Sequence, residues 1–263
     1  MDQAQARRRR ATMTGIALAT HGLSKNFGAL KVTQDVRFEL PVGARRALIG
    51  PNGAGKTTFI NLLTGMLAPD SGTIELDGKA ITALPPQDRV KRGLARTYQI
   101  NTLFPDLTPL EAVTLVVCER RGMSRQWFPA LAGRQAVIEE AYALLAQLGI
   151  GDQAHRLTRH LAYGHQRVLE IALALATEPH VLLLDEPAAG VPAQESGILY
   201  EVISALPKEI AVLFIEHDMD LVFRFASHIT VLVSGHVLRE GPPAQIAEDP
   251  EVRAVYLGTA ARG

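Results

Sequence analysis

The chain contains a glycine-rich segment with the residue types and spacing that bind a nucleotide phosphate. Residues 50–58 match the pattern G-x-x-x-x-G-K-[ST]. Glycines let backbone N–H groups curl around phosphate oxygens, and a following helix presents its positive N-terminal end to them. In this pattern Lys56 reaches the β- and γ-phosphates, and the Thr57 hydroxyl ligates Mg²⁺. We expect a phosphate loop formed by Gly50, Pro51, Asn52, Gly53, Ala54, Gly55, Lys56, Thr57 and Thr58.

Two carboxylates follow an apolar segment late in the chain. Residues 181–184 read Val-Leu-Leu-Leu and are followed by Asp185 and Glu186. Asp185 stands where a carboxylate can contact Mg²⁺, and Glu186 where a base can polarise an attacking water. Acidic residues at a strand end are commonly only a solvated turn. The phosphate loop earlier in the chain favours the catalytic interpretation.

Two other segments carry candidate site residues, but neither predicts a function when taken alone. Residues 161–166 precede a long apolar helix over 167–177 and indicate only a helix start. His217 follows an apolar run, where an ordinary polar residue is the simpler interpretation. Their weight depends on the motifs that accompany them.

Strands and helices must position these residues. Residues 89–159 are rich in Leu, Ala and Glu with helical spacing. The order of strands, helical insert and alternating strands and helices predicts an α/β phosphate-loop core interrupted by a helical lobe. The other expected elements are strands at 16–21, 32–40, 47–49, 72–78, 181–184, 212–215 and 229–233, and a helix over 57–67 that Pro69 ends.

Composition narrows the class of protein. The 263 residues carry 27 basic and 27 acidic side chains, so no overall field attracts nucleic acid or an anionic membrane. The single cysteine, Cys118, forms no intramolecular disulfide and agrees with a reducing cytosol. No stretch approaches the roughly 20 apolar residues that span a bilayer. The basic tail 1–14, with Arg7 to Arg10, is expected to be disordered, and we assign it no function.

Taken together and in order, these motifs resemble those of ABC transporter ATPases. Residues 161–166 are similar to the family's signature L-S-G-G-Q, residues 97–99 to its Q-loop, and residues 216–218 to its switch histidine. Phe27 matches the aromatic residue that stacks on adenine. The resemblance covers nearly the whole chain from Leu18 onward. It implies an ABC-type P-loop NTPase core with an antiparallel β subdomain and a helical subdomain, in a single domain over 15–259 (core 15–88 and 166–259, helical subdomain about 89–165).

The same resemblance implies an ATPase in which two subunits close head to tail around two ATP molecules. Gly164 permits close approach, and the helix that starts near His165 offers its N-terminus to a γ-phosphate. The implied roles are catalysis by Glu186, His217, Lys56 and Gln99; Mg²⁺ ligation by Thr57, Gln99 and Asp185; and contact with the partner's ATP by Leu161, Ala162, Tyr163, Gly164, His165 and Gln166.

Within the family, the chain is most similar to the ATPases of branched-chain amino-acid importers. This implies a cytoplasmic subunit on the inner face of the cell membrane that serves import of branched-chain amino acids or related amides. Its partners would be a second ABC ATPase in a heterodimer, two integral membrane permease subunits and an external substrate-binding protein, with no nucleic acid. The similarity lies in residues 95–99, 161–166, 169–172, 185–190, 215–221 and 256–258, the last of which lipopolysaccharide-export ATPases share.

Four departures from the family pattern fall on elements donated to the opposite nucleotide or to the dimer contact. Ala162 replaces the usual serine, which removes a hydroxyl contact contributing roughly 1.5–3 kcal/mol. His165 replaces a glutamine, Leu173 an arginine, and Pro192 with the following alanine the Asp/Asn-Pro of the D-loop. We expect an asymmetric heterodimer in which the site using this chain's signature is the weaker one.

Other functions stay open at this point. Lipid or lipopolysaccharide export is an alternative form of transport. A soluble ABC protein of DNA repair or translation is a second class, although these usually carry long coiled-coil insertions or two cassettes, and neither is present. A GTPase usually needs an Asn-Lys-x-Asp sequence, which the chain lacks.

Overall fold

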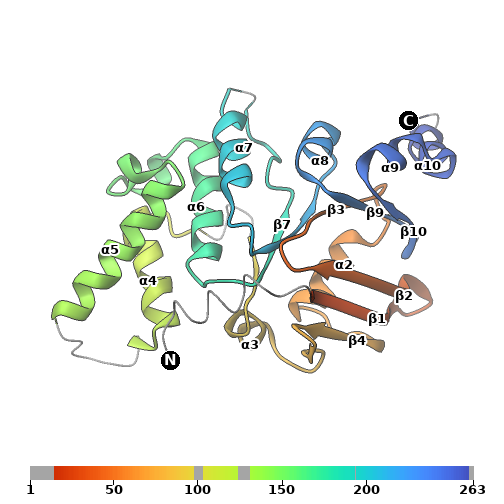
Figure 1. Ribbon diagram of the computed structural model, residues 1–263, viewed down its shortest axis with the longest axis horizontal. Helices are drawn as coiled ribbons and strands as arrows, with labels where there is room; N and C mark the ends of the chain where they lie inside the picture. Colours follow the sequence, from red (N-terminus) through yellow and green to blue (C-terminus); the bar gives the residue numbers. More distant parts are fainter. Residues whose placement is uncertain (1–14, 98–102, 124–130, 193, 261–263) are drawn as a thin grey trace. The chain divides into compact units, whose positions relative to one another are not determined.

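The structure, a computed structural model, describes residues 15–97, 103–123, 131–192 and 194–260. The basic tail, Gln99 and Ala193 lie outside the described residues. The chain divides into two compact units, one formed by residues 1–94, 180–186 and 207–263 and the other by 95–179 and 187–206. Figure 1 shows the helices and strands of both units.

An antiparallel sheet forms the start of the first unit. Its strand order is β2-β1-β4-β5. Along β2 the side chains of Val36, Phe38 and Leu40 are buried while their neighbours are exposed, as expected for a sheet with one covered face. The antiparallel subdomain is confirmed. Its strands are β1 (Ile16–Phe27), β2 (Leu30–Pro41), β4 (Ser71–Leu76) and β5 (Lys79–Ala80).

The apolar runs of the sequence form a second, mostly parallel sheet in order β10-β9-β3-β8-β7-β6. Strand β3 pairs parallel with β8 and β9, β7 pairs parallel with β8, and only β10 pairs antiparallel among the pairings described. The predicted buried strands and the α/β fold class are therefore confirmed. The strands are β3 (Arg45–Ile49), β6 (Leu94–Arg96), β7 (Val181–Asp185), β8 (Ala211–Ile215), β9 (His228–Val233) and β10 (His236–Gly241).

Helix α2 (Lys56–Thr64) packs between the two sheets. Phe59 meets Phe38 of β2 edge to face with 5.6 Å between ring centroids, and Leu62 and Leu63 join the same buried cluster as residues from both sheets. In Figure 1 the helices α8 (Met219–Phe225), α9 (Pro243–Glu248) and α10 (Pro250–Ala260) lie on the side of β3 and β9 away from β1 and β2. The parallel sheet is thus covered on both faces, which explains its continuous apolar strands.

The expected end of α2 was wrong. The helix stops at Thr64, because Gly65 adopts a left-handed conformation with φ of 80° and its N–H bonds the carbonyl of Leu62. Helix α3 (Pro86–Lys91) supplies a second cap: the Arg89 guanidinium donates to the carbonyls of Leu62 and Leu63 at 2.7 Å each. Burial lowers the pKa of Arg89, whose side chain is 1% exposed.

The second unit is helical, as predicted. Helix α4 packs against α5, and apolar side chains of both helices are buried, among them Val113 and Val117 of α4 and Val137 and Ala141 of α5. Short 3₁₀ turns lie at Gly151–Gln153 and Thr158–His160. Its helices are α4 (Pro109–Arg120), α5 (Leu131–Gln147), α6 (Tyr163–Leu175) and α7 (Ser196–Ala205).

The unit's boundaries differ from the expected range 89–165. Residues 166–179 and 187–206 belong to the helical unit rather than to the core, because α7 packs on α6. Residues 89–94 belong to the first unit, where Arg89 binds the end of α2.

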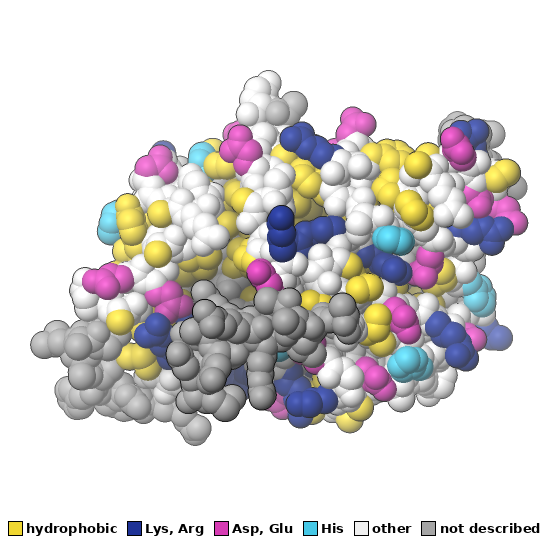
Figure 2. All heavy atoms as spheres, viewed as in Figure 1, with side chains coloured by type: hydrophobic (Ala, Val, Ile, Leu, Met, Phe, Trp, Pro, Cys, Tyr) yellow, Lys and Arg dark blue, Asp and Glu magenta, His cyan; other side chains and the backbone are white. Residues whose placement is uncertain are grey.

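Two surface properties bear on partners. Within the described ranges, none of the helices is both long enough and apolar enough to cross a membrane. On the face shown in Figure 2, basic and acidic side chains are interspersed rather than gathered by sign.

Arg89→Leu should lower the free energy of unfolding by roughly 3 kcal/mol or more, because it leaves the carbonyls at the end of α2 without donors. Urea unfolding measures this change. Lys91→Ala on the same helix, whose side chain is exposed, should change the value by no more than about 0.5 kcal/mol. Equal effects of the two substitutions would contradict the capping role.

Candidate nucleotide-binding site

Three segments with predicted site residues leave the parallel sheet at one edge. Asp185 at the end of β7 is paired with Ile215 at the end of β8, and Leu48 of β3 is paired with Ile215 from the other side. The carboxyl ends of neighbouring parallel strands meet at the same edge, where α/β proteins bind ligands. The phosphate loop, the Asp185–Glu186 pair and His217 therefore emerge side by side.

Close packing at its first and last glycines fixes the phosphate loop. A Cβ atom on Gly50 would lie 2.1 Å from the carbonyl oxygen of Leu232, and one on Gly55 would lie 2.5 Å from that of Val32. Gly55 also has a φ of 99°, which L side chains rarely adopt. By contrast, Gly53 with φ of 79° has nothing within 4 Å of its Cβ position. The loop therefore requires glycine for packing at positions 50 and 55 and for backbone conformation at 53.

Lys56 lies across this loop. Its Nζ donates to the carbonyl of Gly50 at 2.6 Å and to that of Pro51 at 3.1 Å. Burial lowers the pKa of Lys56, and the negative charges of Glu186 and Asp185 oppose part of that change. The ammonium group thus lies within the electrostatic reach of both predicted catalytic carboxylates. Thr57, next to it at the start of α2, is exposed, and Thr58 is half-buried.

Glu186 and His217 face each other. Glu186 Oε1 lies 3.7 Å from His217 Nδ1, and their side chains are 47% and 69% exposed. Glu186 has a φ of 47°, unusual for a non-glycine residue, and its N–H bonds the carbonyl of Ile215 at 3.0 Å. Water can reach both side chains, as an attack on a bound phosphate requires.

Glu216, for which the sequence predicts no separate role, supports His217. Glu216 is only 2% exposed, and its Oε2 accepts a hydrogen bond from the backbone N–H of His217 at 3.2 Å. A carboxylate directly after a fully apolar strand was the available signal.

Two further predicted residues have different outcomes. Phe27 ends β1 with 48% of its surface exposed, and Lys25 Nζ lies 5.9 Å from its ring centroid. An exposed ring at a strand end offers a face for stacking. Gln99 lies outside the described residues, so its predicted part in metal binding stays a prediction.

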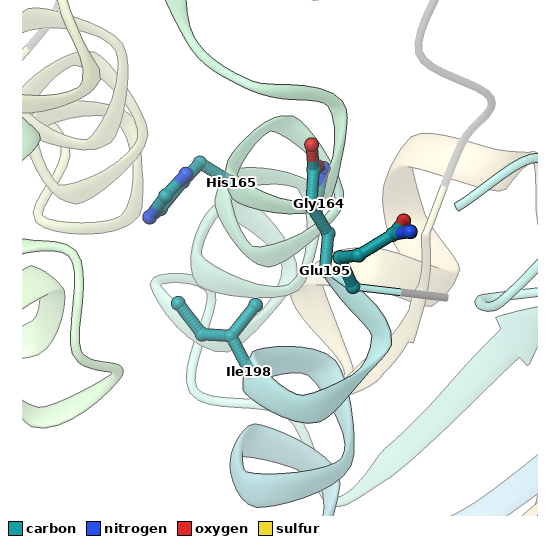
Figure 3. A pocket seen from close by; sticks show the side chains of 5 residues that line it. Gly164, His165, Glu195 and Ile198 are labelled. Carbon is teal, nitrogen blue, oxygen red and sulfur yellow. The ribbon is translucent and has the colours of Figure 1, made fainter. Parts of the chain in front are cut away.

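The signature segment belongs to the second unit and opens α6. Ala162 is the N-cap and offers no side-chain acceptor to the helix, while Leu161 is buried and Gln166 Nε2 donates to the Leu161 carbonyl at 3.0 Å. The N–H of Gly164 donates to Glu195 Oε2 at 2.6 Å. A hollow of about 200 Å³ lies beside this helix start. Figure 3 shows the side chains around it. The hollow is lined by Gly164, His165, Gln194, Glu195 and Ile198.

A buried ion pair lies one turn further along α6. Arg167 and Glu170 are 2.9 Å apart, with side chains 7% and 5% exposed. Burial raises the pKa of Glu170 to about 7, against the opposing effect of Arg167. Arg167 also donates to the carbonyl of Ala189 at 3.1 Å, and the Tyr163 hydroxyl donates to the same carbonyl at 3.3 Å. The segment after Glu186 is thereby attached to the signature helix.

Comparison with known proteins assigns the family. A model described as "ABC transporter" matches residues 33–189. The chain belongs to the ABC transporter family. A second model, described as "Branched-chain amino acid ATP-binding cassette transporter", matches residues 240–262. As a member of the ABC family, the chain is an ATP-binding subunit and an ATPase.

Named relatives match over almost their full length. The chain is similar to the high-affinity branched-chain amino acid transport ATP-binding protein BraF of Pseudomonas aeruginosa, with 38% identity over 92% of this chain and 98% of the relative. LivG of Salmonella typhimurium, of the same description, is 39% identical over 92% and 98%. Among solved structures, the ADP conformation of the ATP-binding cassette MJ1267 matches with a TM-score of 0.80 and 29% identity, covering 93% of this chain and 100% of that one.

Gly55→Ala should destabilise the ABC ATPase more than Gly53→Ala. Both substitutions force an L residue into a left-handed conformation at about 1–2 kcal/mol. Only Gly55→Ala also drives a methyl group into the Val32 carbonyl, which should add roughly 1–3 kcal/mol. Urea unfolding of the two variants measures the difference, and equal losses would contradict the packing argument.

Proposed function

We propose that this ATPase is the motor subunit of an importer for branched-chain amino acids or related amides. Support comes from the match of residues 240–262 to the branched-chain amino acid model and from the relatives BraF and LivG. The model match lies over the end of β10 and helices α9 and α10, outside the motifs that bind nucleotide. It therefore supports the transport class independently of the phosphate loop.

The observation that carries the ATPase mechanism is the meeting of Lys56, Glu186 and His217 at the ends of β3, β7 and β8. Backbone N–H groups of residues 52–58, at the phosphate loop and the start of α2, bind the triphosphate, and Phe27 stacks on the adenine. The Lys56 ammonium exchanges its bonds to the Gly50 and Pro51 carbonyls for phosphate oxygens. Charge on the β- and γ-phosphates is thereby offset.

Hydrolysis requires a water in line with the γ-phosphate. Glu186 accepts a hydrogen bond from that water and takes its proton as the oxygen attacks phosphorus, while the bond from the γ-phosphorus to the bridging oxygen of the β-phosphate breaks and ADP leaves. His217, 3.7 Å from Glu186, fixes the carboxylate and contacts the γ-phosphate side of the site. The strained backbone of Glu186 sets the direction of its side chain.

The oxygen donors near the phosphate loop fit Mg²⁺, although they do not form a dedicated cluster of metal-binding side chains. Within the described ranges, no group of three or more His, Cys, Asp or Glu side chains could hold a metal ion. Mg²⁺ in nucleotide sites is bound by one or two protein oxygens together with phosphates and waters. The Thr57 hydroxyl and Asp185 would supply those oxygens, with Gln99 as a further ligand. Bound there, the metal would neutralise charge that develops on the phosphates.

Two such subunits are needed for a complete machine. The phosphate loop belongs to the first unit of this chain and the signature to the second. The signature residues 161–166 serve the nucleotide of a second ATPase, which makes a heterodimer with this chain. Two integral membrane permease subunits and an external substrate-binding protein complete the importer at the inner face of the membrane. Since Ala162 and Pro192 lack polar side chains, the site that uses this signature is the weaker one.

Glu186→Gln should lower ATP turnover by about 100-fold or more, because it removes the base but keeps the shape of the side chain. ATP should still be retained, since Lys56 and the loop are unchanged. Turnover of the assembled complex and filter-binding of labelled ATP measure the two properties. The same change in the second ATPase should reduce turnover less, and equal losses would refute the asymmetry.

Deletion of this subunit should abolish high-affinity uptake of branched-chain amino acids or of a related amide such as urea. Cells that lack the chain, complemented with wild type or with Glu186→Gln, are assayed with labelled leucine, an aliphatic amide and urea. Wild type should restore the uptake that the variant does not. Retained uptake of all three compounds after deletion would exclude the importer in this form.

A further inference from the structure

A carboxylate of the same chain, that of Glu195, binds the start of the signature helix α6. Glu195 Oε2 accepts the N–H of Gly164 at 2.6 Å, and hydrogen bonds to a carboxylate are shorter and stronger than those between neutral groups. Figure 3 shows Glu195 beside Gly164 at the first turn of this helix. Glu195 is the N-cap of α7, yet its side chain makes no capping bond to its own helix. Its carboxylate is thus directed to the neighbouring helix instead.

The sequence of α6 explains why this contact is favourable. The first backbone N–H groups of a helix have no partners within it and are normally satisfied by the N-cap side chain. Here the N-cap is Ala162, which has no acceptor. A carboxylate from another element fills that need, and the positive end of the helix dipole stabilises its charge. Glu195 therefore supplies the cap that residue 162 cannot.

Glycine at position 164 is what allows this approach. A Cβ on Gly164 would lie 3.0 Å from the Cβ of Glu195 and 3.2 Å from its carbonyl oxygen, closer than nearly all real Cβ contacts. The space in front of this glycine is thus filled by Glu195, the N-cap of α7.

The same N–H is needed by the nucleotide. Under the proposed function, on which this inference rests, the start of α6 presents its N–H groups to the γ-phosphate of the second subunit's ATP. A carboxylate and a phosphate cannot both occupy one donor, and like charges at close range repel each other. No second acidic side chain lines the hollow, so Glu195 is the charge that opposes the incoming phosphate among the described lining residues.

We propose that Glu195 is a latch on the signature: its carboxylate occupies the Gly164 N–H and must be displaced before the second subunit's triphosphate binds there. Glu195 is a positioning residue for ATP-driven closure, and it takes no part in the bond-breaking step. Because of this contact, the two subunits close at a higher ATP concentration than they would if the Gly164 N–H were free. The contact also gives the chain a capped, stable signature helix before closure.

Glu195→Gln tests the latch, because it removes the charge and keeps the size of the side chain. The variant is compared with wild type in the complex purified with the second ATP-binding subunit. Neutral hydrogen bonds are about half as strong as charge-assisted ones, so the KM for MgATP should fall by about threefold to tenfold while kcat stays within about twofold. An unchanged or raised KM would overturn the proposal.

Matched variants separate the latch from other effects. Glu201→Gln removes a charge from an exposed position on the same helix, and its KM should equal that of wild type. Lys56→Ala should lower the amount of labelled ATP that the protein retains in filter-binding. If Lys56→Ala retained ATP normally, the proposed nucleotide site itself would fail. If Lys56→Ala lost ATP while Glu195→Gln matched Glu201→Gln, only the latch would fail.

Loss of the helix cap is controlled by restoring it at residue 162. Glu195→Gln should lower the melting temperature by a few degrees, and adding Ala162→Ser should recover it, because serine caps the same helix start. The double variant should have a KM at or below that of Glu195→Gln, because the serine hydroxyl also adds a contact to the phosphate. A KM that returned to the wild-type value together with the melting temperature would show that Glu195 acts only as a cap.

Discussion

The parallel pairing of β3, β8 and β7 is the constraint on which the site depends. Neighbouring strands lie about 4.8 Å apart, so three adjacent strands bring their carboxyl ends within reach of long side chains. Ile215 of β8 is opposite both Leu48 and Asp185. This register brings Glu186 close enough for its negative charge to raise the pKa of Lys56 against the effect of burial. It also places Glu186 beside His217. The phosphate loop precedes Glu186 and His217 by more than a hundred residues in sequence, and the sheet brings them together.

The phosphate loop is in turn held by elements outside the site. Gly50 packs on the Leu232 carbonyl and Gly55 on that of Val32, and the N–H of Gly235 bonds the Ala54 carbonyl at 2.9 Å. At the other end of α2, Arg89 binds the final carbonyls. A flexible glycine-rich sequence thereby becomes one conformation, with its N–H groups oriented before any ligand arrives.

The second unit shows how departures from a family pattern can be accommodated. Ala162 cannot cap α6, and Glu195 from α7 takes the place of the missing hydroxyl. Arg167 and Tyr163 both donate to the Ala189 carbonyl, so the segment after Glu186 follows the signature helix. Burial of the Arg167–Glu170 pair gives this connection a fixed geometry, since both side chains lose their freedom inside the unit. Replacing a residue of the signature is thus compensated through neighbours that are distant in sequence.

The sequence by itself determined the phosphate loop, the Asp185–Glu186 pair, the buried strands and the family, because these follow from local spacing and apolar periodicity. It misplaced the end of α2, since a glycine in the left-handed conformation ended the helix before Pro69 did. It also assigned α6 and α7 to the core, because the packing of one helix on another is not written in either helix alone. Only the tertiary structure revealed the roles of Glu195, Glu216 and Arg89. Each acts on a backbone group that belongs to another element or to a neighbouring loop residue, and the sequence shows the side chain but not the backbone group it will meet.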